Sequence, residues 1–269
     1  MALGASALGT ARPAGAQLRP LEPLEWGVFA PERAVLVSVG VGLHDGQDAR
    51  LIGTTGRLQE VGNYMLVWRT GRVALEASGT AYRRFRENGI VSPVVAEGTE
   101  PPGGPGSVRD DDGDLRLLTA VRLSPEPSPL AVALRFGVRL PTTDNKIGLD
   151  RDATDFVATL AADYARGRLQ LGGEAGIGLM TTRFPEYEQA DLIQYAARVA
   201  WNGGLVTPTF RWIGQATTAP FEVQGNESLG EVRLGATIGR QRWLRVEVLR
   251  GTEAPSPHLG GLLTVGATY

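Results

Sequence analysis

Arginines and carboxylates recur at alternate positions of segments that are otherwise apolar, so they share one face of each segment. A guanidinium group presents fixed donors to carboxylates and phosphates, and an interior lined by such groups would favour anions. The alternative is that these charges pair with one another and brace, or even plug, a narrow interior. The candidate interior residues are Arg72, Glu76, Arg84, Arg116, Arg122, Arg135, Arg139, Asp155, Asp163, Glu174, Arg198, Arg211, Glu231 and Arg233.

The two histidines form a second candidate site. His44 ends the first alternating segment and His258 begins the last, so pairing of those segments would bring both residues to one rim. Histidine titrates near neutral pH and is a common metal ligand, which makes a proton-linked or metal-binding role conceivable there. The alternative is a solvated rim at which the histidines have no role.

Motifs of other chemistry are missing from the sequence, which has no Cys, no Gly-x-Ser-x-Gly and no phosphate-binding loop. Asp110–Asp112 lacks the spacing of an EF-hand loop. Ser256 is close to His258 but lies between Pro255 and Pro257, as in a plain turn. We therefore expect no enzymatic activity, no cofactor and no bound metal.

The elements that must position these residues are β-strands. Leu130–Leu140 places large apolar side chains at even positions and small or charged side chains at odd positions. Side chains of a strand point alternately to its two faces, so this pattern predicts one apolar and one polar face. About eleven further segments alternate in the same way, at 33–44, 57–69, 72–85, 114–124, 154–166, 168–180, 190–201, 205–216, 228–238, 242–250 and 258–269.

The links between these segments are alternately long and short. The link at 86–113 is the longest and contains prolines, glycines and an acidic run, whereas Asn202–Gly204 is a tight hairpin turn. Outer-membrane barrels have short periplasmic turns and longer extracellular loops, and a soluble sandwich has no reason to sort its links in this way. The sequence therefore predicts an all-β fold, a closed antiparallel up-and-down transmembrane β-barrel of about 12 strands spanning residues 33–269.

Composition agrees with a single large β domain. The chain has 269 residues, a formal net charge of -2 and no basic stripe, so no nucleic-acid partner is expected. Residues 1–16 are small and apolar and end in Ala14-Gly-Ala16, which indicates a signal peptide or its remnant. A disordered tail is the alternative. Residues 17–32 contain three prolines and are expected to be an extended periplasmic lead-in.

Two parts of the chain resemble known families. The C-terminal sequence Leu262–Tyr269 resembles the last strand of Gram-negative outer-membrane proteins, which implies recognition by the barrel-assembly machinery through the strand ending at Tyr269. Arg139-Leu-Pro-Thr-Thr-Asp144, followed by Thr154–Phe156, resembles the signature of the meta-pathway phenol-degradation family of outer-membrane proteins. Thr143 stands where that family usually has Gly. The resemblance covers roughly residues 128–180 and implies a barrel that passes small hydrophobic or aromatic compounds.

These observations predict a barrel in the bacterial outer membrane, in contact with its lipid, that acts as a narrow channel or transporter for small hydrophobic or anionic compounds. One alternative is an outer-membrane barrel enzyme of the lipase or protease kind. Another is a soluble β-sandwich that binds a ligand. Pairing of the first strand with the last would close the barrel and leave its apolar face with only lipid to cover it.

Overall fold

A computed structural model describes residues 20–25, 34–49, 52–91, 101–126, 128–144, 146–150, 153–181, 191–218 and 228–269. This part of the chain is all-β, and no helix within it is long and apolar enough to cross a membrane. The strands are β1 (Val35–Ala49), β2 (Thr54–Thr70), β3 (Val73–Ile90), β4 (Val108–Asp111), β5 (Leu115–Arg122), β6 (Leu130–Leu140), β7 (Asp155–Arg166), β8 (Leu169–Leu179), β9 (Leu192–Trp201), β10 (Val206–Thr217), β11 (Leu229–Gly239), β12 (Arg242–Gly251) and β13 (Leu259–Thr268).

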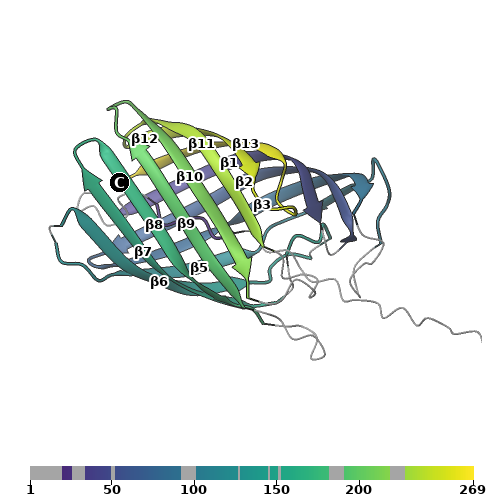
Figure 1. Cartoon of the computed structure of the whole chain (residues 1–269), viewed down its shortest axis with the longest axis horizontal. Coiled ribbons are helices and arrows are strands. Elements are labelled where there is room, and N and C mark those ends of the chain that lie inside the picture. Colours follow the sequence, from purple (N-terminus) through teal and green to yellow (C-terminus); the bar gives the residue numbers. More distant parts are fainter. Residues whose placement is uncertain are drawn as a thin grey trace, which may run out of the picture.

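Twelve of these strands close into an antiparallel barrel, which confirms the predicted fold (Figure 1). Neighbours in sequence are neighbours in the sheet, and the seam is the pairing of β1 with β13, from Leu36 opposite Thr268 to Asp45 opposite Leu259. The short β4 is the exception, because it pairs only with the end of β3 and is not part of the ring. Closure leaves no free edge on the ring, and the β-sandwich alternative is not the fold observed.

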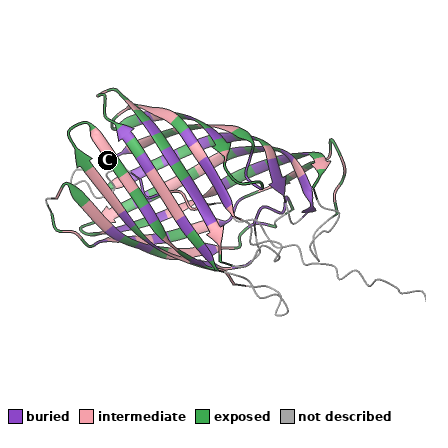
Figure 2. Ribbon diagram, viewed as in Figure 1, coloured by how far each residue is buried: buried purple, intermediate pink, exposed green. Residues whose placement is uncertain are grey.

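The two faces of the barrel wall have opposite character, as the stripes of Figure 2 show. On β6, Leu134 and Phe136 are exposed on the outer surface, whereas Arg135 between them is buried inside. Large apolar side chains are exposed in the same way on most of the other ring strands. A closed barrel offers these side chains no protein surface to pack against, so only an apolar solvent outside can bury them.

A bulge at Gly62 reverses the inward and outward alternation of β2. The glycine has a φ of 72°, and the pairing with β1 shifts between Gly40 and Val41. Glu60 therefore points inward before the bulge and Met65 points inward after it, an odd number of residues later. An extra residue in one strand has this effect in antiparallel sheets.

The same region of β3 contains a matching change of alternation, which makes one prediction about the interior wrong. Ala81 and Tyr82 are both exposed, and beyond them Arg83 is buried while the side chain of Arg84 is 54% exposed. Arg84 lies on the outer face near Asp110 and does not line the interior. Arg83 takes the inward position, one residue away.

Strands β1, β2 and β3 continue beyond the others at the end of the long loops (Figure 1). The link expected at 86–113 is therefore shorter, since it begins within β3 and includes β4. The loop between β6 and β7 packs against this extension. The loop and the extension together bury a small apolar core. Its members are Ala49, Ile52, Leu58, Phe85, Ile147 and Leu149.

Candidate functional site

The segment Pro20–Glu25 runs inside the barrel, where it is held by its backbone and by an apolar side chain. The amide of Leu24 donates to Oε2 of Glu174 at 2.9 Å, and Nη1 of Arg135 donates to the carbonyl of Glu22 at 2.8 Å. Leu24 is buried against Leu36 of β1 and neighbouring small residues of the wall. Residues 17–32 were expected to be a periplasmic lead-in. Of this range, residues 17–19 and 26–32 lie outside the described residues, as do residues 1–16, for which a signal peptide was expected. Residues 20–25 lie in the interior, where the wall offers them complementary charges.

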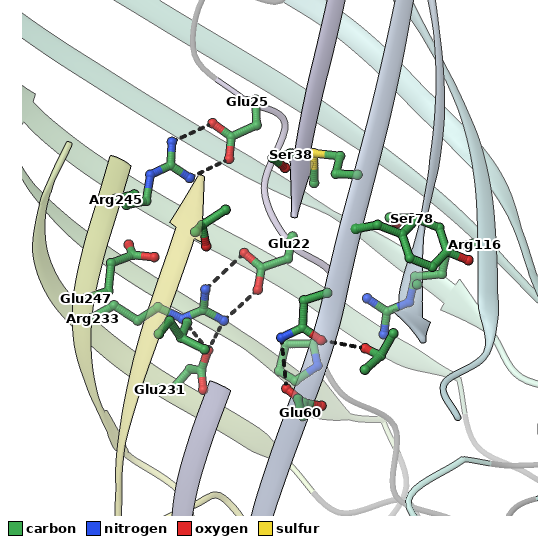
Figure 3. A pocket seen from close by; sticks show the side chains of 18 of the residues that line it. Glu22, Glu25, Ser38, Glu60, Ser78, Arg116, Glu231, Arg233, Arg245 and Glu247 are labelled. Carbon is green, nitrogen blue, oxygen red and sulfur yellow. Dashed lines mark hydrogen bonds and ion pairs between the residues drawn. The ribbon is translucent and has the colours of Figure 1, made fainter. Parts of the chain in front are cut away.

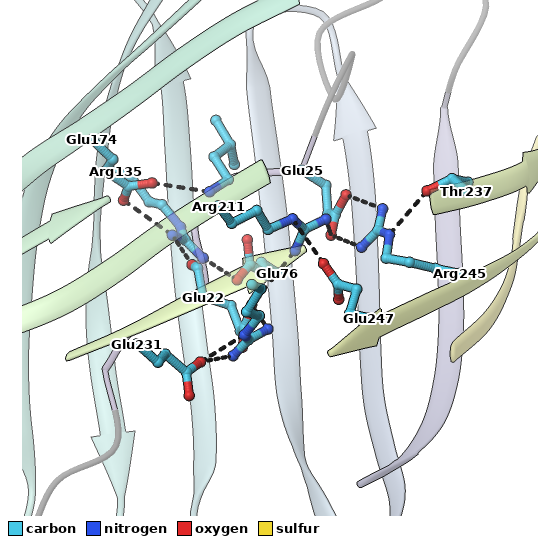
Figure 4. A network of polar contacts seen from close by, with 12 residues as sticks. Glu22, Glu25, Glu76, Arg135, Glu174, Arg211, Glu231, Thr237, Arg245 and Glu247 are labelled. Carbon is cyan, nitrogen blue, oxygen red and sulfur yellow. Dashed lines mark hydrogen bonds and ion pairs between the residues drawn. The ribbon is translucent and has the colours of Figure 1, made fainter. Parts of the chain in front are cut away.

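Two glutamates of this segment are each held by one arginine of the wall (Figures 3 and 4). Oε1 and Oε2 of Glu25 accept from Arg245 on β12 at 2.8 and 3.0 Å. Both oxygens of Glu22 accept from Arg233 on β11, Oε2 at 3.1 Å. Paired hydrogen bonds between a guanidinium and a carboxylate are strong and directional. They therefore fix the position of the segment and compensate the charges of its glutamates.

Arg211 on β10 lies between these two pairs. Its guanidinium nitrogens are 3.8 Å from Glu22, 3.6 Å from Glu25 and 3.4 Å from Glu247 on β12. These distances join the two glutamates of the segment and the wall into one charged network, which Figure 4 shows.

A second cluster lies on the opposite wall and centres on Arg135 of β6. Its guanidinium pairs with Glu76 of β3 and with Glu174 of β8, the latter at 3.0 Å. Thr159 of β7 donates to the same Glu174 at 2.5 Å. Arg135 is only 1% exposed, so all of its charge is compensated inside the protein. This cluster links four strands across the interior.

A third cluster lies at the end of the barrel that carries the long loops. Arg139 of β6 pairs with Asp155 of β7 and lies 3.5 Å from Asp150 of the β6–β7 loop. Asp150 also pairs with Arg83 of β3. On the other side, Asp114 lies 3.4 Å from Arg139. Asp150 thus ties the loop to inward-facing arginines of β3 and β6.

Asp114 gives this third cluster a testable pH dependence. Burial, and then the negative charge of Asp150, raises the pKa of Asp114 from 3.8 to about 6. The folded state therefore prefers the neutral acid, and this stabilisation is complete below the unfolded pKa and is lost as the pH rises through about 6. We expect Asp114→Asn, which keeps an acceptor for the amides of Thr142 and Thr143, to gain stability relative to the wild type across this window.

The measurement is the urea concentration at half-unfolding, compared at several values between about pH 4 and about pH 7. Asp144→Asn is the matched control, since the side chain of Asp144 is 79% exposed beside Lys146. Its profile should run parallel to that of the wild type. A parallel profile for Asp114→Asn as well would show that burial of Asp114 does not cause the dependence.

A cavity of about 160 Å³ remains between the N-terminal segment and the wall. It is bounded by charged groups of the network around Arg211 and of the third cluster, and by small polar side chains, among them Ser38 and Ser78 (Figure 3). Such a polar space suits water or a small polar solute rather than an apolar one. A polar space of this size therefore adjoins the N-terminal segment inside the barrel.

Most of the residues that the sequence placed on the inner face are buried there or border interior cavities. The prediction that Arg72 faces the interior is wrong, as it is for Arg84. Arg72 lies exposed in the tight turn before β3 and outside the strand. The inward set comprises Glu76, Arg116, Arg122, Arg135, Arg139, Asp155, Asp163, Glu174, Arg198, Arg211, Glu231 and Arg233.

Several interior charges were missed by the sequence analysis. Arg245 and Glu247 alternate with exposed Val246 and Val248 on β12, so the periodicity that identified the others could have found them. Asp114 could have been found in the same way, since it begins the segment 114–124 and shares the parity of Arg116 and Arg122. The other missed residues lie next to a bulge, in a loop or in the N-terminal segment, where strand periodicity gives no reliable signal. They are Glu22, Glu25, Glu60, Arg83 and Asp150.

The two histidines meet different surroundings. His44 is buried inside the barrel, with Nε2 3.2 Å from Oε2 of Glu60. His258 is exposed and lies over Gly46, and only its backbone pairs with β1, through the carbonyl of Asp45. The strands do pair as expected, but His44 stands opposite Gly260, and its side chain is buried whereas that of His258 is exposed. Within the described residues, no group of three or more potential ligands could hold a metal ion.

No family model matches the chain, and neither does any curated protein. The resemblance to the meta-pathway phenol-degradation family is therefore not shown. Solved structures that are similar in shape include LpxR from Salmonella typhimurium (12% identity, 87% of this chain and 100% of that one, TM-score 0.45). Others are the outer-membrane channel DcaP of Acinetobacter baumannii (8%, 88% and 96%, 0.44) and the outer-membrane protein OprD from Pseudomonas aeruginosa (11%, 88% and 92%, 0.37). Likeness at this level does not tell what this chain does.

One prediction about activity is corrected by these comparisons. The absence of catalytic motifs led to the expectation that the chain is not an enzyme. The barrel enzyme LpxR is nevertheless among the similar structures, so the question of a catalytic activity is open.

Proposed function

We propose that this chain is a bacterial outer-membrane β-barrel that forms a narrow channel for small polar or anionic compounds, and that Pro20–Glu25 closes it from within. Support for the membrane location comes from the apolar outer face of a ring that has no free edge. Support for a channel comes from the arginine-rich inner face. The resemblance of Arg139–Asp144 noted above would add small aromatic compounds to the candidate solutes.

The observation that carries the proposal is the way in which Pro20–Glu25, called the plug from here on, is held. Glu22 and Glu25 are bound to the wall by ion pairs and not by a continuous β-sheet ladder. An ion pair can be exchanged for another ion, whereas a strand built into the sheet cannot leave without opening the barrel. The segment is therefore suited to closing the interior reversibly.

The assembly of such a barrel would depend on its last strand. Strand β13 forms the seam with β1, and Tyr269, just after it, is 66% exposed. An exposed aromatic side chain at this place fits the headgroup level of a bilayer. We propose that the barrel-assembly machinery recognises β13 and Tyr269 before the seam closes.

Single-channel recording in planar lipid bilayers tests the channel. The full-length wild type is expected to conduct rarely, and the double variant Glu22→Gln/Glu25→Gln to open several times more often, because neutral amides hold Arg233 and Arg245 less strongly than carboxylates. A second variant that lacks residues 20–25 should conduct in every insertion.

Glu126→Gln is the matched control, since Glu126 pairs with Arg69 and Arg122 near a short turn, away from the plug. It should behave as the wild type does. Folding of each variant is checked by the change in electrophoretic mobility on heating. Folded barrels that lack residues 20–25 and still carry no current would contradict the channel proposal.

A further inference from the structure

We propose that the inner wall formed by β10, β11 and β12 is a binding site for small organic dicarboxylates, and that Glu22 and Glu25 occupy it as an internal ligand. The inference deepens the channel proposal, on which it rests for its biological meaning, by naming the class of solute. The site is built from Arg211, Arg233 and Arg245.

The positions of the arginines in the sheet are the first argument. Arg211 stands directly opposite Arg198 on β9 and directly opposite Arg233 on β11. Like charges in directly opposed positions destabilise a sheet unless other charges compensate them. Arg198 has its own partner in Asp163 of β7. The charges of Arg211 and Arg233 must be compensated from elsewhere.

The available carboxylates are the second argument. The wall itself supplies two to its three arginines, Glu231 beside Arg233 and Glu247 beside Arg211. The N-terminal segment supplies the other two. Without the segment, the three guanidinium groups would face the interior with an excess of positive charge. A buried excess of this kind is costly, so departure of the segment favours entry of another anion.

The hydrogen bonds of Arg211 are the third argument. The residue is 2% exposed, yet its Nε and Nη2 have no hydrogen-bond partner among the described residues. Its nearest carboxylate oxygens are 3.4 to 3.8 Å away, too far for good hydrogen bonds. The internal ligand therefore satisfies Arg233 and Arg245 well and Arg211 poorly. A free ligand, which no peptide chain constrains, could approach Arg211 more closely.

The shape of the site favours two carboxylates over one phosphate. The segment places its two carboxylates on two separate guanidinium planes, each bound through both oxygens. Planar forks of this kind match carboxylates at two places. Between them the adjoining cavity of about 160 Å³ leaves space, and removal of the segment adds to it. A short chain with a carboxylate at each end would reproduce what Glu22 and Glu25 present.

Binding to the purified, detergent-solubilised full chain tests the inference, with glutarate, acetate and inorganic phosphate as probes in isothermal titration calorimetry. Glutarate should bind Glu22→Gln/Glu25→Gln at least about ten-fold more tightly than the wild type, because the internal ligand no longer competes. In that variant glutarate should also bind about ten-fold more tightly than acetate or phosphate.

Two further substitutions, each added to the double variant, show where glutarate binds. Arg211→Gln should abolish the binding, whereas Arg122→Gln, at the rim beside Ser124 and Glu126, should leave it unchanged. Absence of glutarate binding in a folded double variant would overturn the inference. Equal binding of phosphate or acetate would overturn it too, as would binding that survives the loss of Arg211.

The assay requires no flux across a membrane, so the two proposals can fail separately. Glutarate binding without any conductance would contradict the channel proposal but support the dicarboxylate site. Conductance without glutarate binding would contradict the site and leave the channel standing.

Discussion

Replacing Arg135 with methionine should lower the free energy of unfolding of the barrel by about 3–5 kcal/mol, the usual cost of breaking a buried ion pair from one side. The change leaves Glu76 and Glu174 inside the barrel without the cation that they share. It also removes the donor to the carbonyl of Glu22. Urea unfolding of the protein in lipid vesicles, followed by tryptophan fluorescence, measures the loss.

Two controls separate the buried charges from the loss of a long side chain. The triple variant Arg135→Met/Glu76→Gln/Glu174→Gln should recover most of the stability, since no unpaired charge is left inside. Arg57→Met should cost no more than about 1 kcal/mol, because the pair of Arg57 with Asp45 is mostly exposed to solvent. If Arg135→Met were as stable as the wild type, the pairing of Arg135 with Glu76 and Glu174 would not be a main support of the barrel.

The strands could be predicted because their signal is local. Leu130–Leu140 has the same bounds in the sequence analysis and in the structure, since each residue reports its own face through its polarity. The signal fails at the bulge of β2 at Gly62 and at the matching change of alternation in β3. The polarity of the sequence does not mark the change in β3, since Arg83 and Arg84 are the same residue type. The inward arginine of β3 was therefore placed one position too late.

The plug could not be predicted, because its contacts are distant in sequence. Glu22 and Arg233 are separated by 211 positions, and Glu25 and Arg245 by 220. A short proline-containing segment has no periodicity that reveals a place inside a barrel. The one available signal was chemical. The wall of β10–β12 carries more arginines than carboxylates, and the partners had to come from outside those strands.

The plug also changes the meaning of the charged interior. From the sequence, a pore that favours anions and a braced or plugged interior were alternatives. In the structure the same residues would serve both purposes, since Arg211 and Arg233, which face the interior, pair with carboxylates of the plug. An arginine whose charge is fully compensated by wall carboxylates, as Arg135 is by Glu76 and Glu174, has no charge left for a solute. An arginine surplus satisfied by a removable segment does.

Substitution of Leu160 by arginine should destabilise the barrel in lipid by about 2–4 kcal/mol, the cost of a cation facing the middle of a bilayer. Leu160 lies in the middle of β7, is 54% exposed and has Leu134 and Ala175 as cross-strand neighbours. An arginine there could neither reach water nor find an acidic partner among those neighbours. Urea unfolding in vesicles measures the loss, as for Arg135.

Leu179→Arg is the matched control, because Leu179 is 45% exposed on the same outer face but ends β8, beside the loops. Its cost should be no more than about 1 kcal/mol, since a long cationic side chain near the interface reaches the headgroups. The difference between the two positions is what bears on location. In water, both arginines would be solvated on the outside of the ring, and the costs would not depend on depth. Equal losses of stability at Leu160 and Leu179 would therefore contradict the proposed membrane location, although not the closed barrel itself.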